Sequence, residues 1–362
     1  MDRATVDAYE AGAQAYRDSR TGRPEEAAAF ARRLPPGAVR ADLGCGPGLD
    51  ASHLGAPLVV LDAAAAMVAL VPTGLRVRGD LAALPFRRGA LAGAWSSKAY
   101  QHLPHEHLPL ALADLHRSLA PDAPVRIGVF AGDGAWTDDE ELPGRRFSWW
   151  APDRFVEVVT GAGFDVESVR RDPNPYNDHL TVVATRARRL PDLVRPGLRL
   201  LVCGLNPSLY AADAGVNYAR PGNRFWPAAL AAGVVTVDRD PWHALRHHGV
   251  GFTDLVGRAT VAAAELRPEE FRAGLDRLDR LCRWLSPGAL CVVGLTGWRA
   301  ATGDRRAVAG WQERRVGGRA VYVMPNPSGL NAHSQVPDLA AHLRAAAEGR
   351  PDDGAGGRLP PG

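Results

Sequence analysis

Short apolar runs alternate with helix-like segments along most of this chain, and this alternation limits the folds open to it. Strands that alternate with helices form a parallel sheet covered by helices on both faces. In the first half the expected strands are Val39–Leu43, Leu58–Leu61, Arg76–Asp80, Gly93–Ser97 and Val125–Phe130. Helical periodicity is clearest at Leu108–Leu119 and Asp153–Ala162. Two further strand-like runs, Phe164–Arg170 and Leu180–Thr185, predict an antiparallel hairpin at the edge of that sheet.

A second block of the same kind follows an arginine- and proline-containing segment, Arg186–Gly197, which we interpret as a linker and the entry to the block. Its expected strands are Leu198–Cys203, Leu290–Gly294 and Ala320–Met324. Its expected helices are Phe225–Ala232, Pro268–Leu285 and Val336–Ala347. A chain of 362 residues is too long for one typical domain. We therefore predict two three-layer α/β/α domains, at 1–187 and 188–348, and a disordered Gly/Pro-rich tail at 349–362.

Composition and charge argue against several classes of protein. No apolar run approaches the roughly 18 residues of a membrane helix, and the charged N-terminus lacks an apolar signal core. We therefore expect a monomeric, cytoplasmic protein with no membrane partner. The net charge of +3 is too small to predict binding of polyanions through bulk charge. The four cysteines form no C-x-x-C pair, so a zinc or iron–sulfur site is not expected.

The first block carries a glycine-rich loop, DLGCGPG, directly after an expected strand. Glycines there let the backbone pass close to a ligand, where a side chain would clash. The candidate ligand-binding residues of this loop are Asp42, Gly44, Cys45, Gly46 and Gly48. Asp62 ends the next apolar run, where a carboxylate can bind both hydroxyls of a ribose. Asp80, followed by Leu81, ends a third expected strand.

Together these three elements resemble the class I S-adenosylmethionine-dependent methyltransferases over about residues 5–187. In that family the glycine loop lines the methionine end of the cofactor. Asp62 matches the acid that binds the ribose, and Asp80 matches the acid that contacts the adenine amine. The segment Trp95–Leu108 is similar to the family's segment that faces both cofactor and substrate. The resemblance implies S-adenosylmethionine as the cofactor of this domain and leaves the methyl acceptor unknown.

Two alternatives remain for this block. A dinucleotide-binding Rossmann domain is one, although D-x-G-x-G-x-G with a loop acid fits methyltransferases better. Few residues separate Gly48 from the strand at Leu58, so the first helix must be short and methyl transfer is left open. Four residues that could suggest a metal site are His102, His105, Glu106 and His107. We interpret them instead as the opening of a helix on a solvated loop, and we predict no metal.

Two polar loops of the second block each follow an expected strand and contain Asn-Pro. Asn206 comes directly after the first strand, so its amide projects from the sheet edge where ligands bind in open α/β sheets. Tyr218, in the same loop, can stack on a planar ring. Asn223 and Arg224 open a helix, where N–H groups and an arginine suit a phosphate. The second loop is Met324–Asn331, and the two loops together predict a two-sided site.

These loops resemble the mismatch-specific uracil-DNA glycosylase family, which includes thymine-DNA glycosylase, from about residue 190 to about residue 347. GLNPSLYAADAG is similar to the family's G-[IL]-N-P-G-L loop, and YARPGNRFW to its F-A-x-P-x-N-R-F-W segment. GVGFTDLVGRAT and MPNPSGLN complete the set of motifs. The resemblance implies an enzyme that flips a base out of the helix and hydrolyses its bond to C1′. Its partner is double-stranded DNA with G·U or related mismatches, and it needs no cofactor or metal.

The resemblance also assigns residue roles. Asn206 holds the attacking water, Tyr218 stacks on the flipped uracil, and Leu330 is the apolar wedge that fills the vacated stack. The other expected base-pocket residues are Leu205, Ser208 and Asn326. The expected DNA-binding residues besides Leu330 are Asn223, Arg224, Ser328, Gly329 and Asn331.

Three residues qualify the expected chemistry. The Asn206 amide cannot accept a proton as a carboxylate can, so a slow enzyme that depends on a good leaving group is expected. Ser208 stands where the family has glycine, which predicts a bias against thymine. Lys98 is the only lysine and lies in the first block, so the glycosylase is expected to be monofunctional. The alternative function is a small-molecule methyltransferase whose second half only binds DNA.

Overall fold

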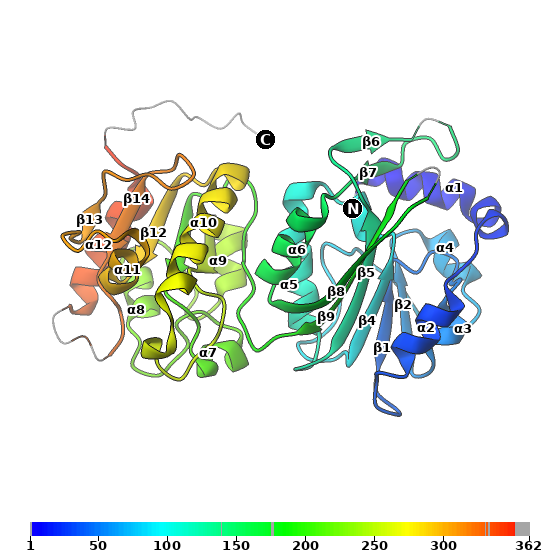
Figure 1. Cartoon of the computed structure of the whole chain (residues 1–362), viewed down its shortest axis with the longest axis horizontal. Coiled ribbons are helices and arrows are strands. Elements are labelled where there is room, and N and C mark those ends of the chain that lie inside the picture. Colours follow the sequence, from blue (N-terminus) through cyan, green and yellow to red (C-terminus); the bar gives the residue numbers. More distant parts are fainter. Residues whose placement is uncertain (1, 139, 175–176, 330, 332–333, 352–362) are drawn as a thin grey trace. The chain divides into compact units, whose positions relative to one another are not determined.

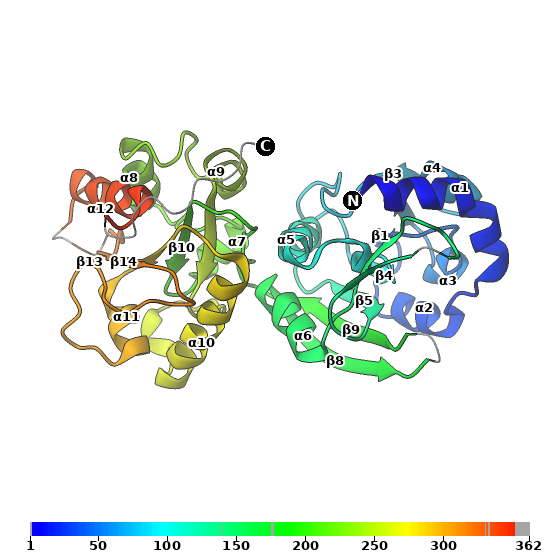
Figure 2. The ribbon, with the colours of Figure 1, turned by 90° about the horizontal axis from the view of Figure 1, so that it is seen from above.

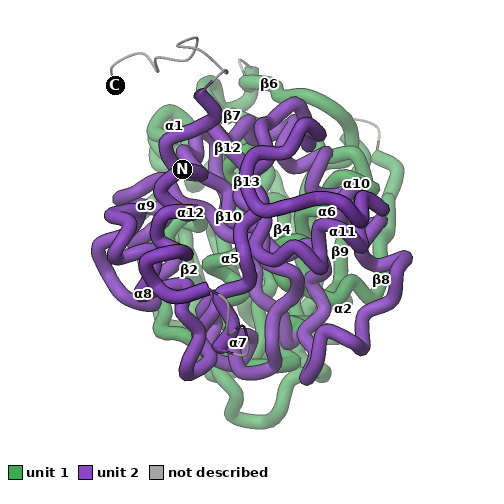
Figure 3. Tube along the Cα trace, turned by 90° about the vertical axis from the view of Figure 1, so that its left-hand side faces the viewer, with its two compact units in different colours: residues 1–187 green, residues 188–362 purple. Residues whose placement is uncertain are grey.

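The computed structural model describes residues 2–138, 140–174, 177–329, 331 and 334–351 (Figure 1). The chain divides into two compact units, Met1–Ala187 and Arg188–Gly362, which Figure 3 distinguishes by colour. We call them unit 1 and unit 2. Within the described residues, no helix has the length and apolar character needed to cross a membrane.

Unit 1 is built on a seven-stranded sheet with the order β3-β2-β1-β4-β5-β9-β8. Its strands are β1 (Arg40–Leu43), β2 (Leu58–Asp62), β3 (Leu75–Arg78), β4 (Gly93–Ser97), β5 (Pro124–Phe130), β8 (Phe164–Asp172) and β9 (His179–Arg186). The strands β1 to β5 pair in parallel, β9 pairs antiparallel with β5, and β8 pairs antiparallel with β9. This order confirms the predicted α/β sheet with an antiparallel closing pair at its edge.

Helices lie on both faces of this sheet. They are α1 (Arg3–Ser19), α2 (Pro24–Ala31), α3 (Ala51–Leu54), α4 (Ala65–Leu70), α5 (Leu108–Ser118) and α6 (Pro152–Gly161). Figure 2 shows α5 and α6 on one face and α2 and α3 on the other. The 3-10 turns η1 (Tyr100–His102) and η2 (His105–His107) precede α5, and the ribbon β6 (Ala135–Thr137) and β7 (Arg146–Ser148) lies outside the sheet. The helix after the glycine loop is short, as the spacing predicted.

The N-terminal helix α1 is an element that the apolar periodicity of the chain did not predict. The Asp2 carboxylate caps it by accepting the Thr5 N–H at 3.0 Å. Glu10, on the same helix, accepts the N–H groups of Ala65 and Ala66 at 2.9 and 2.6 Å, at the start of α4. These bonds satisfy backbone donors that a helix start leaves unpaired, and they attach α1 to α4 beside the glycine loop.

Unit 2 is built on a five-stranded sheet with the order β11-β10-β12-β14-β13. Its strands are β10 (Leu200–Gly204), β11 (Val250–Asp254), β12 (Ala289–Val293), β13 (Gly310–Trp311) and β14 (Val321–Met324). The strands pair in parallel except β13, which is antiparallel to β14. Every residue of the four parallel strands is buried, as expected of strands with helices on both faces.

The helices of unit 2 form two groups. They are α7 (Leu209–Ala214), α8 (Phe225–Ala231), α9 (Pro241–His248), α10 (Pro268–Leu285), α11 (Leu295–Thr302) and α12 (Val336–Glu348), with a 3-10 turn η3 (Ala263–Glu265). Figure 2 shows α8, α9 and α12 on one face of the sheet and α10 and α11 on the other. The expected helices at 225–232, 268–285 and 336–347 correspond to α8, α10 and α12. The strand β11 was not predicted, although its residues lie in the motif GVGFTDLVGRAT.

The segment that we interpreted as a linker, Arg186–Gly197, is partly buried and hydrogen-bonded instead of being exposed to solvent along its whole length. Arg186 ends β9, and Leu193 is buried in unit 2, where it exchanges two backbone hydrogen bonds with Phe252 of β11 at 2.8 and 3.0 Å. Asp192 pairs with Arg277 of α10 at 2.6 Å. The apolar residues between the prolines therefore make this segment part of the second unit's edge.

Candidate functional sites

The first candidate site lies at the carboxyl edge of the unit 2 sheet. The parallel strands end at Gly204, Asp254, Val293 and Met324, so the loops that follow them meet at this edge. One cavity there is lined by Leu190, Leu205, Asn206, Pro207, Ser208, Ala211, Asn217, Tyr218, Arg220, Asn223, Asp254, Ala263, Val293, Asn326 and Ser328. The cavity therefore unites most of the residues that the sequence predicted for the base pocket and the DNA contacts.

Asn206 is held rigidly by its amide nitrogen. Nδ2 donates to the carbonyl oxygens of Pro207 and Arg258, each at 3.1 Å, and to the Thr260 hydroxyl at 2.8 Å. The two carbonyl oxygens can only accept, so they identify the atom between them as the nitrogen and orient the amide. The described part of the chain offers no hydrogen-bond donor to Oδ1, so this oxygen is left to accept a hydrogen bond from a molecule in the cavity.

The motif that contains Thr260 explains how Asn206 is positioned. Thr260 donates its backbone N–H to Pro207 O at 3.1 Å and accepts the Leu209 N–H on its own carbonyl at 3.3 Å. These bonds join the loop after β11 to the residues that directly follow Asn206 in the loop after β10. The motif GVGFTDLVGRAT thus helps to position Asn206 through contacts between Thr260 and the Asn-Pro loop.

Tyr218 stands in a left-handed conformation, with φ of 57°, which places its ring in the cavity wall. The ring stacks on Phe225 with 4.2 Å between centroids and 22° between planes. Its partner covers one face of the phenol. Burial, followed by the nearby Asp254 carboxyl, holds the pKa of Tyr218 well above its usual range, so the phenol stays neutral.

Ser208 lines the cavity but its hydroxyl serves a helix. It is the N-cap of α7, and Oγ accepts the Ala211 N–H at 3.1 Å. Rotation of this side chain away from the cavity or deeper into it would break the cap. The Ser208 side chain is therefore held in one rotamer, and a glycine at this position would lack both the side chain and the cap.

Arg224, from the first polar loop, holds the second polar loop in place by hydrogen bonds to its backbone. The Arg224 guanidinium donates to Ser328 O at 2.7 Å and to Asn331 O, while its backbone N–H donates to Pro327 O at 2.9 Å. The sequence assigned Arg224 to DNA, whereas here its side chain is directed to the protein backbone. Its Nε is buried without an acceptor among the described residues. Arg224 therefore positions the loop after β14.

The other loop residues are mostly engaged in turns. Asn223 Oδ1 accepts the Phe225 N–H at 2.9 Å at the start of α8. Asn326 Oδ1 accepts the Ser328 N–H at 3.0 Å, and Asn331 Nδ2 donates to Asn326 O at 2.9 Å. Among the described residues, the Nδ2 groups of Asn223 and Asn326 have no hydrogen-bond acceptor, so both can face a ligand.

Two residues at the tip of the second loop complete the predicted DNA set. A side chain on Gly329 would come within 3.0 Å of Gly222 O, so this loop passes close to the loop that leads into α8. Leu330, the predicted wedge, lies outside the described residues. Its assignment rests on the sequence alone.

Asp254 lines the same cavity and was missed by sequence reasoning. It is the last residue of β11, and only 9% of it is exposed. Burial, followed by the charge of Asp192, raises the pKa of Asp254 to about 7. The signal was present in the chain, because an acid directly after the apolar run VGFT resembles the placement that singled out Asp62.

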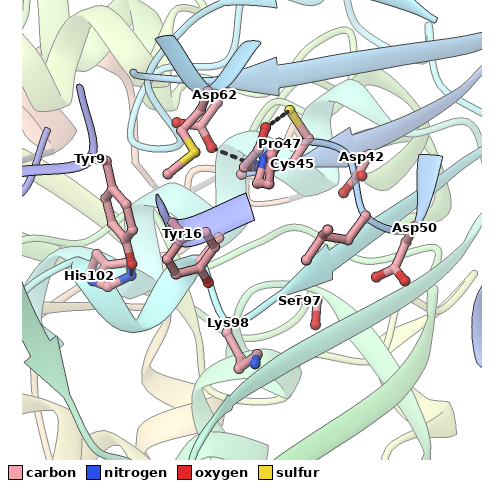
Figure 4. Close-up of a pocket in the computed structure, with 15 residues that line it drawn as sticks. Tyr9, Tyr16, Asp42, Cys45, Pro47, Asp50, Asp62, Ser97, Lys98 and His102 are labelled. Carbon is pink, nitrogen blue, oxygen red and sulfur yellow. Dashed lines mark hydrogen bonds between the residues drawn. The ribbon is translucent and has the colours of Figure 1, made fainter. Parts of the chain in front are cut away.

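The second candidate site lies in unit 1, at the carboxyl ends of β1, β2 and β4. Figure 4 shows its cavity, which is lined by Tyr9, Tyr16, Asp42, Gly44, Cys45, Gly46, Pro47, Leu49, Asp50, Asp62, Met67, Ser97, Lys98, Ala99 and His102. The Asp62 carboxylate accepts the N–H groups of Gly46 and Ala64 at 2.9 and 3.0 Å. These bonds hold the glycine loop against the end of β2.

The glycines of the loop have different functions in the fold. Gly46, with φ of 52°, would direct a side chain into open space, so its backbone faces the cavity freely. A side chain on Gly48 would collide with Val71 and Pro72, and Gly48 does not line the cavity. Gly46 therefore suits close approach of a ligand, whereas Gly48 suits packing.

Besides Gly48, two predicted cofactor residues do not line this cavity. Asp80 follows β3 and lines a separate surface hollow with Arg3, Val6 and Ala63. Its Oδ1 accepts the Ala82 N–H at 2.9 Å. Leu81 is buried beneath Gly44. The strand β3 ends before Asp80, at Arg78, and this shorter strand leaves the acid in a turn.

The acids of the cavity are deeply buried. Asp42 is 3% exposed, and burial together with the charges of Asp50 and Asp62 holds its pKa well above the usual range. Burial also raises the pKa of Asp62. A ligand that carries positive charge would stabilise the ionised forms of these carboxyl groups, which burial alone disfavours.

Tyr9 and Tyr16 were not predicted as lining residues, and His102 was expected there only as part of the segment Trp95–Leu108. Tyr9 and Tyr16 lie seven positions apart in the chain, a spacing that places both on one face of α1. Tyr9 Oη lies 2.9 Å from His102 Nε2, and His102 Nδ1 lies 2.6 Å from Arg146 O. The expectation that His102 opens a helix on a solvated loop was wrong, because His102 is buried. That burial lowers the pKa of His102 to about 4.

A second cavity adjoins the first and shares Tyr9, Tyr16 and Lys98 with it. Its other lining residues are Arg20, Gln101, Phe130, Trp136, Asp138, Glu140, Glu141, Arg145, Phe147, Asn174, Asn177 and His179. Lys98 has φ of 59° and lies at the boundary of both cavities. Burial of its ammonium group lowers the pKa of Lys98. Among the described residues, no group of three or more potential ligands could hold a metal ion.

Comparison with known proteins identifies a domain in each unit. Residues 191–348 match the uracil DNA glycosylase superfamily, and residues 41–127 match a methyltransferase domain. Among solved structures, the 1,6-didemethyltoxoflavin-N1-methyltransferase of Burkholderia thailandensis is similar, with 20% identity and a TM-score of 0.43. The match covers 51% of this chain and 88% of that chain. An S-adenosylmethionine dependent methyltransferase from Mesorhizobium loti has 20% identity and a TM-score of 0.35, covering 45% of this chain and 100% of that chain.

Proposed function

We propose that this chain, which joins a methyltransferase domain to a uracil DNA glycosylase superfamily domain, excises uracil from mismatched duplex DNA. The observation that carries the proposal is the orientation of Asn206. Its Nδ2 is fully engaged, and its Oδ1 is free of described donors at the wall of a cavity suited to a flipped base. An oxygen placed in this way can accept a hydrogen bond from a water molecule.

The reaction follows from what this amide can and cannot do. The bound water attacks C1′, the C1′–N1 bond breaks, and its electron pair stays on the base. Since an amide is a very weak base, Asn206 orients the water without taking up its proton, which passes to solvent. The rate then depends on how well the departing base carries negative charge, which favours uracil and other electron-poor pyrimidines.

The surrounding residues support base flipping. Tyr218 is neutral, rigidly stacked on Phe225 and part of the cavity wall, so it suits contact with a planar base. In this proposal the loop after β14, which Arg224 holds in place, presents Gly329 to the DNA, and the sequence assigns the role of wedge to Leu330. A small apolar side chain at that place would fill the gap left by the base.

The test is release of uracil from duplex DNA that carries deoxyuridine opposite guanine. The full chain should leave abasic sites that alkali converts to strand breaks, and Asn206→Ala should abolish release. Duplex affinity should change little, because phosphate contacts supply most of it. A wild-type protein that releases no uracil, or an Asn206→Ala variant with the wild-type single-turnover rate, would contradict the proposal.

A second function is favoured for unit 1, namely methyl transfer from S-adenosylmethionine. The donor set fits that cofactor, because its ammonium and sulfonium groups are cationic and Asp42, Asp50 and Asp62 line the cavity. Asp62 is placed to accept ribose hydroxyls beside Gly46. When bound, the cofactor would supply an electrophilic methyl group. The adjoining cavity with Phe130, Trp136 and Phe147 would hold an acceptor of unknown identity.

Calorimetry on the full chain with S-adenosylmethionine tests this second function. Micromolar affinity is expected, and Asp62→Ala should remove most of the binding. Because each cavity is lined by residues of its own unit, Asp62→Ala should leave uracil release unchanged and Asn206→Ala should leave cofactor binding unchanged. Absence of binding at millimolar cofactor would contradict the assignment of this pocket.

The alternative is a methyltransferase whose second unit only binds DNA. It predicts duplex binding without uracil release in the wild-type protein. The anchoring of Asn206 by Pro207, Arg258 and Thr260 favours the catalytic proposal, because DNA binding alone has no need of an oriented amide in a cavity.

A further inference from the structure

Asp254 is a buried acid in the unit 2 cavity with no assigned role. It ends β11 directly beside Gly204 of β10, to which it is paired in parallel register. A side chain built on Gly204 would collide with Asp254 Oδ1 and would lie 3.1 Å from the Tyr218 hydroxyl. The acid and the phenol therefore lie against the same glycine, next to the loop that carries Asn206.

The Asp254 carboxyl group has no hydrogen-bond partner among the residues that the structure describes. It receives no hydrogen bond from any residue that the structure describes, although it is 91% buried, since 9% of the residue is exposed. The Arg277 guanidinium donates to the backbone carbonyl oxygen of Asp254 at 2.7 Å and to the Asp192 carboxylate at 2.6 Å. Buried polar groups are normally paired, so an unpaired acid in a cavity wall points to a ligand.

The groups around Asp254 favour its neutral form. Asp192 repels a negative charge there, and Arg277 opposes this effect only in part because it is paired with Asp192. Tyr218 and Cys203 stay neutral, since burial and Asp254 itself keep the pKa of each well above its usual range. With a pKa of about 7, Asp254 is protonated in a large share of molecules at neutral pH and can donate a hydrogen bond.

We propose that protonated Asp254 donates a hydrogen bond to a carbonyl oxygen of the flipped pyrimidine and thereby assists its departure. The inference rests on the proposed glycosylase function. As the C1′–N1 bond breaks, negative charge spreads from N1 to the ring carbonyl oxygens. A neutral acid stabilises that charge, whereas an ionised carboxylate at the same place repels it. Asp254 keeps its proton, which distinguishes it from a general acid that protonates the leaving group.

The experiment is a pH profile of single-turnover uracil release by the full chain, from about pH 5.5 to about pH 9. Wild-type rates should be level at low pH and fall by about tenfold per unit above roughly neutral pH, as expected when one protonated group is required. Asp254→Asn keeps a hydrogen-bond donor that does not titrate. It should flatten the profile and keep activity within about tenfold of wild type at low pH, because one donor replaces another.

Two further variants make the result specific. Asp254→Ala should be slower than wild type at low pH, because it has no donor, and its profile should be flat, because it has no group that ionises. Asp276→Asn, a matched change at an exposed acid of α10, should keep the wild-type profile. Thermal unfolding of each variant checks that the fold is retained. An Asp254→Asn profile that still falls at high pH, or a wild-type rate that rises with pH through neutrality, would overturn the proposal.

A binding measurement separates this inference from the proposed function. DNA with a 2′-fluorinated deoxyuridine resists cleavage, so its affinity can be measured across the same pH range without turnover. Wild-type affinity should weaken above neutral pH while Asp254→Asn affinity does not. If the wild-type protein releases no uracil yet shows this difference, the glycosylase proposal fails and the contact between Asp254 and the base stands. If the two proteins show the same dependence, the contact is contradicted.

Discussion

At the scale of single residues, the site in unit 2 depends on which atom of a side chain is engaged. Asn206 places its nitrogen within hydrogen-bond distance of three oxygen atoms of the protein and presents its Oδ1 to the cavity. The same chemical group with the opposite orientation would offer a donor to the water and could not hold it for attack. The neighbours Pro207, Arg258 and Thr260 therefore decide the function of Asn206 as much as the amide does.

This arrangement predicts that Asn206→Asp does not produce a faster enzyme. An ionised carboxylate would place an oxygen where Nδ2 stands, facing the carbonyl oxygens of Pro207 and Arg258, and only the Thr260 hydroxyl could turn to donate to it. Like partial charges at hydrogen-bond distance repel, and each unpaired buried acceptor costs about 1–3 kcal/mol. Single-turnover release at neutral pH should be at least about tenfold slower than wild type. A variant faster than wild type would show that the loop readjusts around the carboxylate.

Ser208 gives a second prediction at this scale, concerning thymine. Its cap to Ala211 fixes the side chain at the cavity wall, so it cannot rotate away from a 5-methyl group. A methyl-sized clash costs about 1–3 kcal/mol, which corresponds to roughly tenfold or more between uracil and thymine. Ser208→Gly should raise release from G·T relative to G·U pairs.

Ser208→Ala is the control for this effect, because it keeps Cβ and removes only the cap. If Ala behaves like serine in the ratio of G·T to G·U release and Gly does not, the bulk of Cβ is responsible. An unchanged ratio in both variants would mean that Ser208 does not meet the base.

At the scale of elements, the two polar loops of unit 2 form one construction. The loop into α8 supplies Arg224, whose guanidinium and backbone hold the carbonyl groups of the loop after β14. Gly329 lies against Gly222, so the loops pass each other closely. Loops positioned by a rigid sheet edge commonly carry function, and here one loop orders the other.

Arg224→Ala should therefore impair excision from duplex DNA more than from single strands. Loss of charge-assisted bonds worth about 1.5–3 kcal/mol each loosens the loop that meets the helix stack, and a drop of about tenfold or more in the duplex rate is expected. A single-stranded substrate has no stack to fill, so its rate should fall much less. Arg305→Ala, at an exposed arginine of the same unit, removes the same charge and serves as the control. Equal losses on both substrates would place Arg224 in the chemistry instead.

At the scale of the whole molecule, each of the two cavities is lined by residues of a single unit. The residues that line the cavity with Asn206 all belong to 188–362, and those that line the cavity with Asp62 all belong to 1–187. The distribution of one residue type separates the units chemically. The only lysine, Lys98, lies in unit 1, and the 188–362 sequence contains none.

This distribution predicts a glycosylase that leaves the abasic strand intact. Glycosylases that also nick DNA attack C1′ with an amine and pass through a Schiff base, and arginine remains protonated and non-nucleophilic. Borohydride treatment during complete uracil release should trap no covalent protein–DNA adduct. An adduct that forms with both wild type and Lys98→Ala would sink the water mechanism and implicate the N-terminal amine.

The local sequence was enough to determine the fold class and most of the strands. Buried parallel strands must be apolar along their whole length, so runs such as Leu58–Asp62 and Ala289–Val293 could be recognised without the structure. Polar loops after such runs have to lie at the carboxyl edge of the sheet, which is why Asn206, Tyr218 and Asn326 could be predicted to share a site.

Only the tertiary structure decided what each of those residues contacts. The parallel register of β10 and β11 brings Asp254 beside Gly204, and docking of α1 brings Tyr9 to His102, although these pairs are far apart in the chain. Asp80 falls outside the cofactor cavity because β3 ends early. Periodicity reports which face of an element is buried, whereas the partner at that face depends on how separate elements pack, and this is where the burial of Asp254 and the engagement of Arg224 arise.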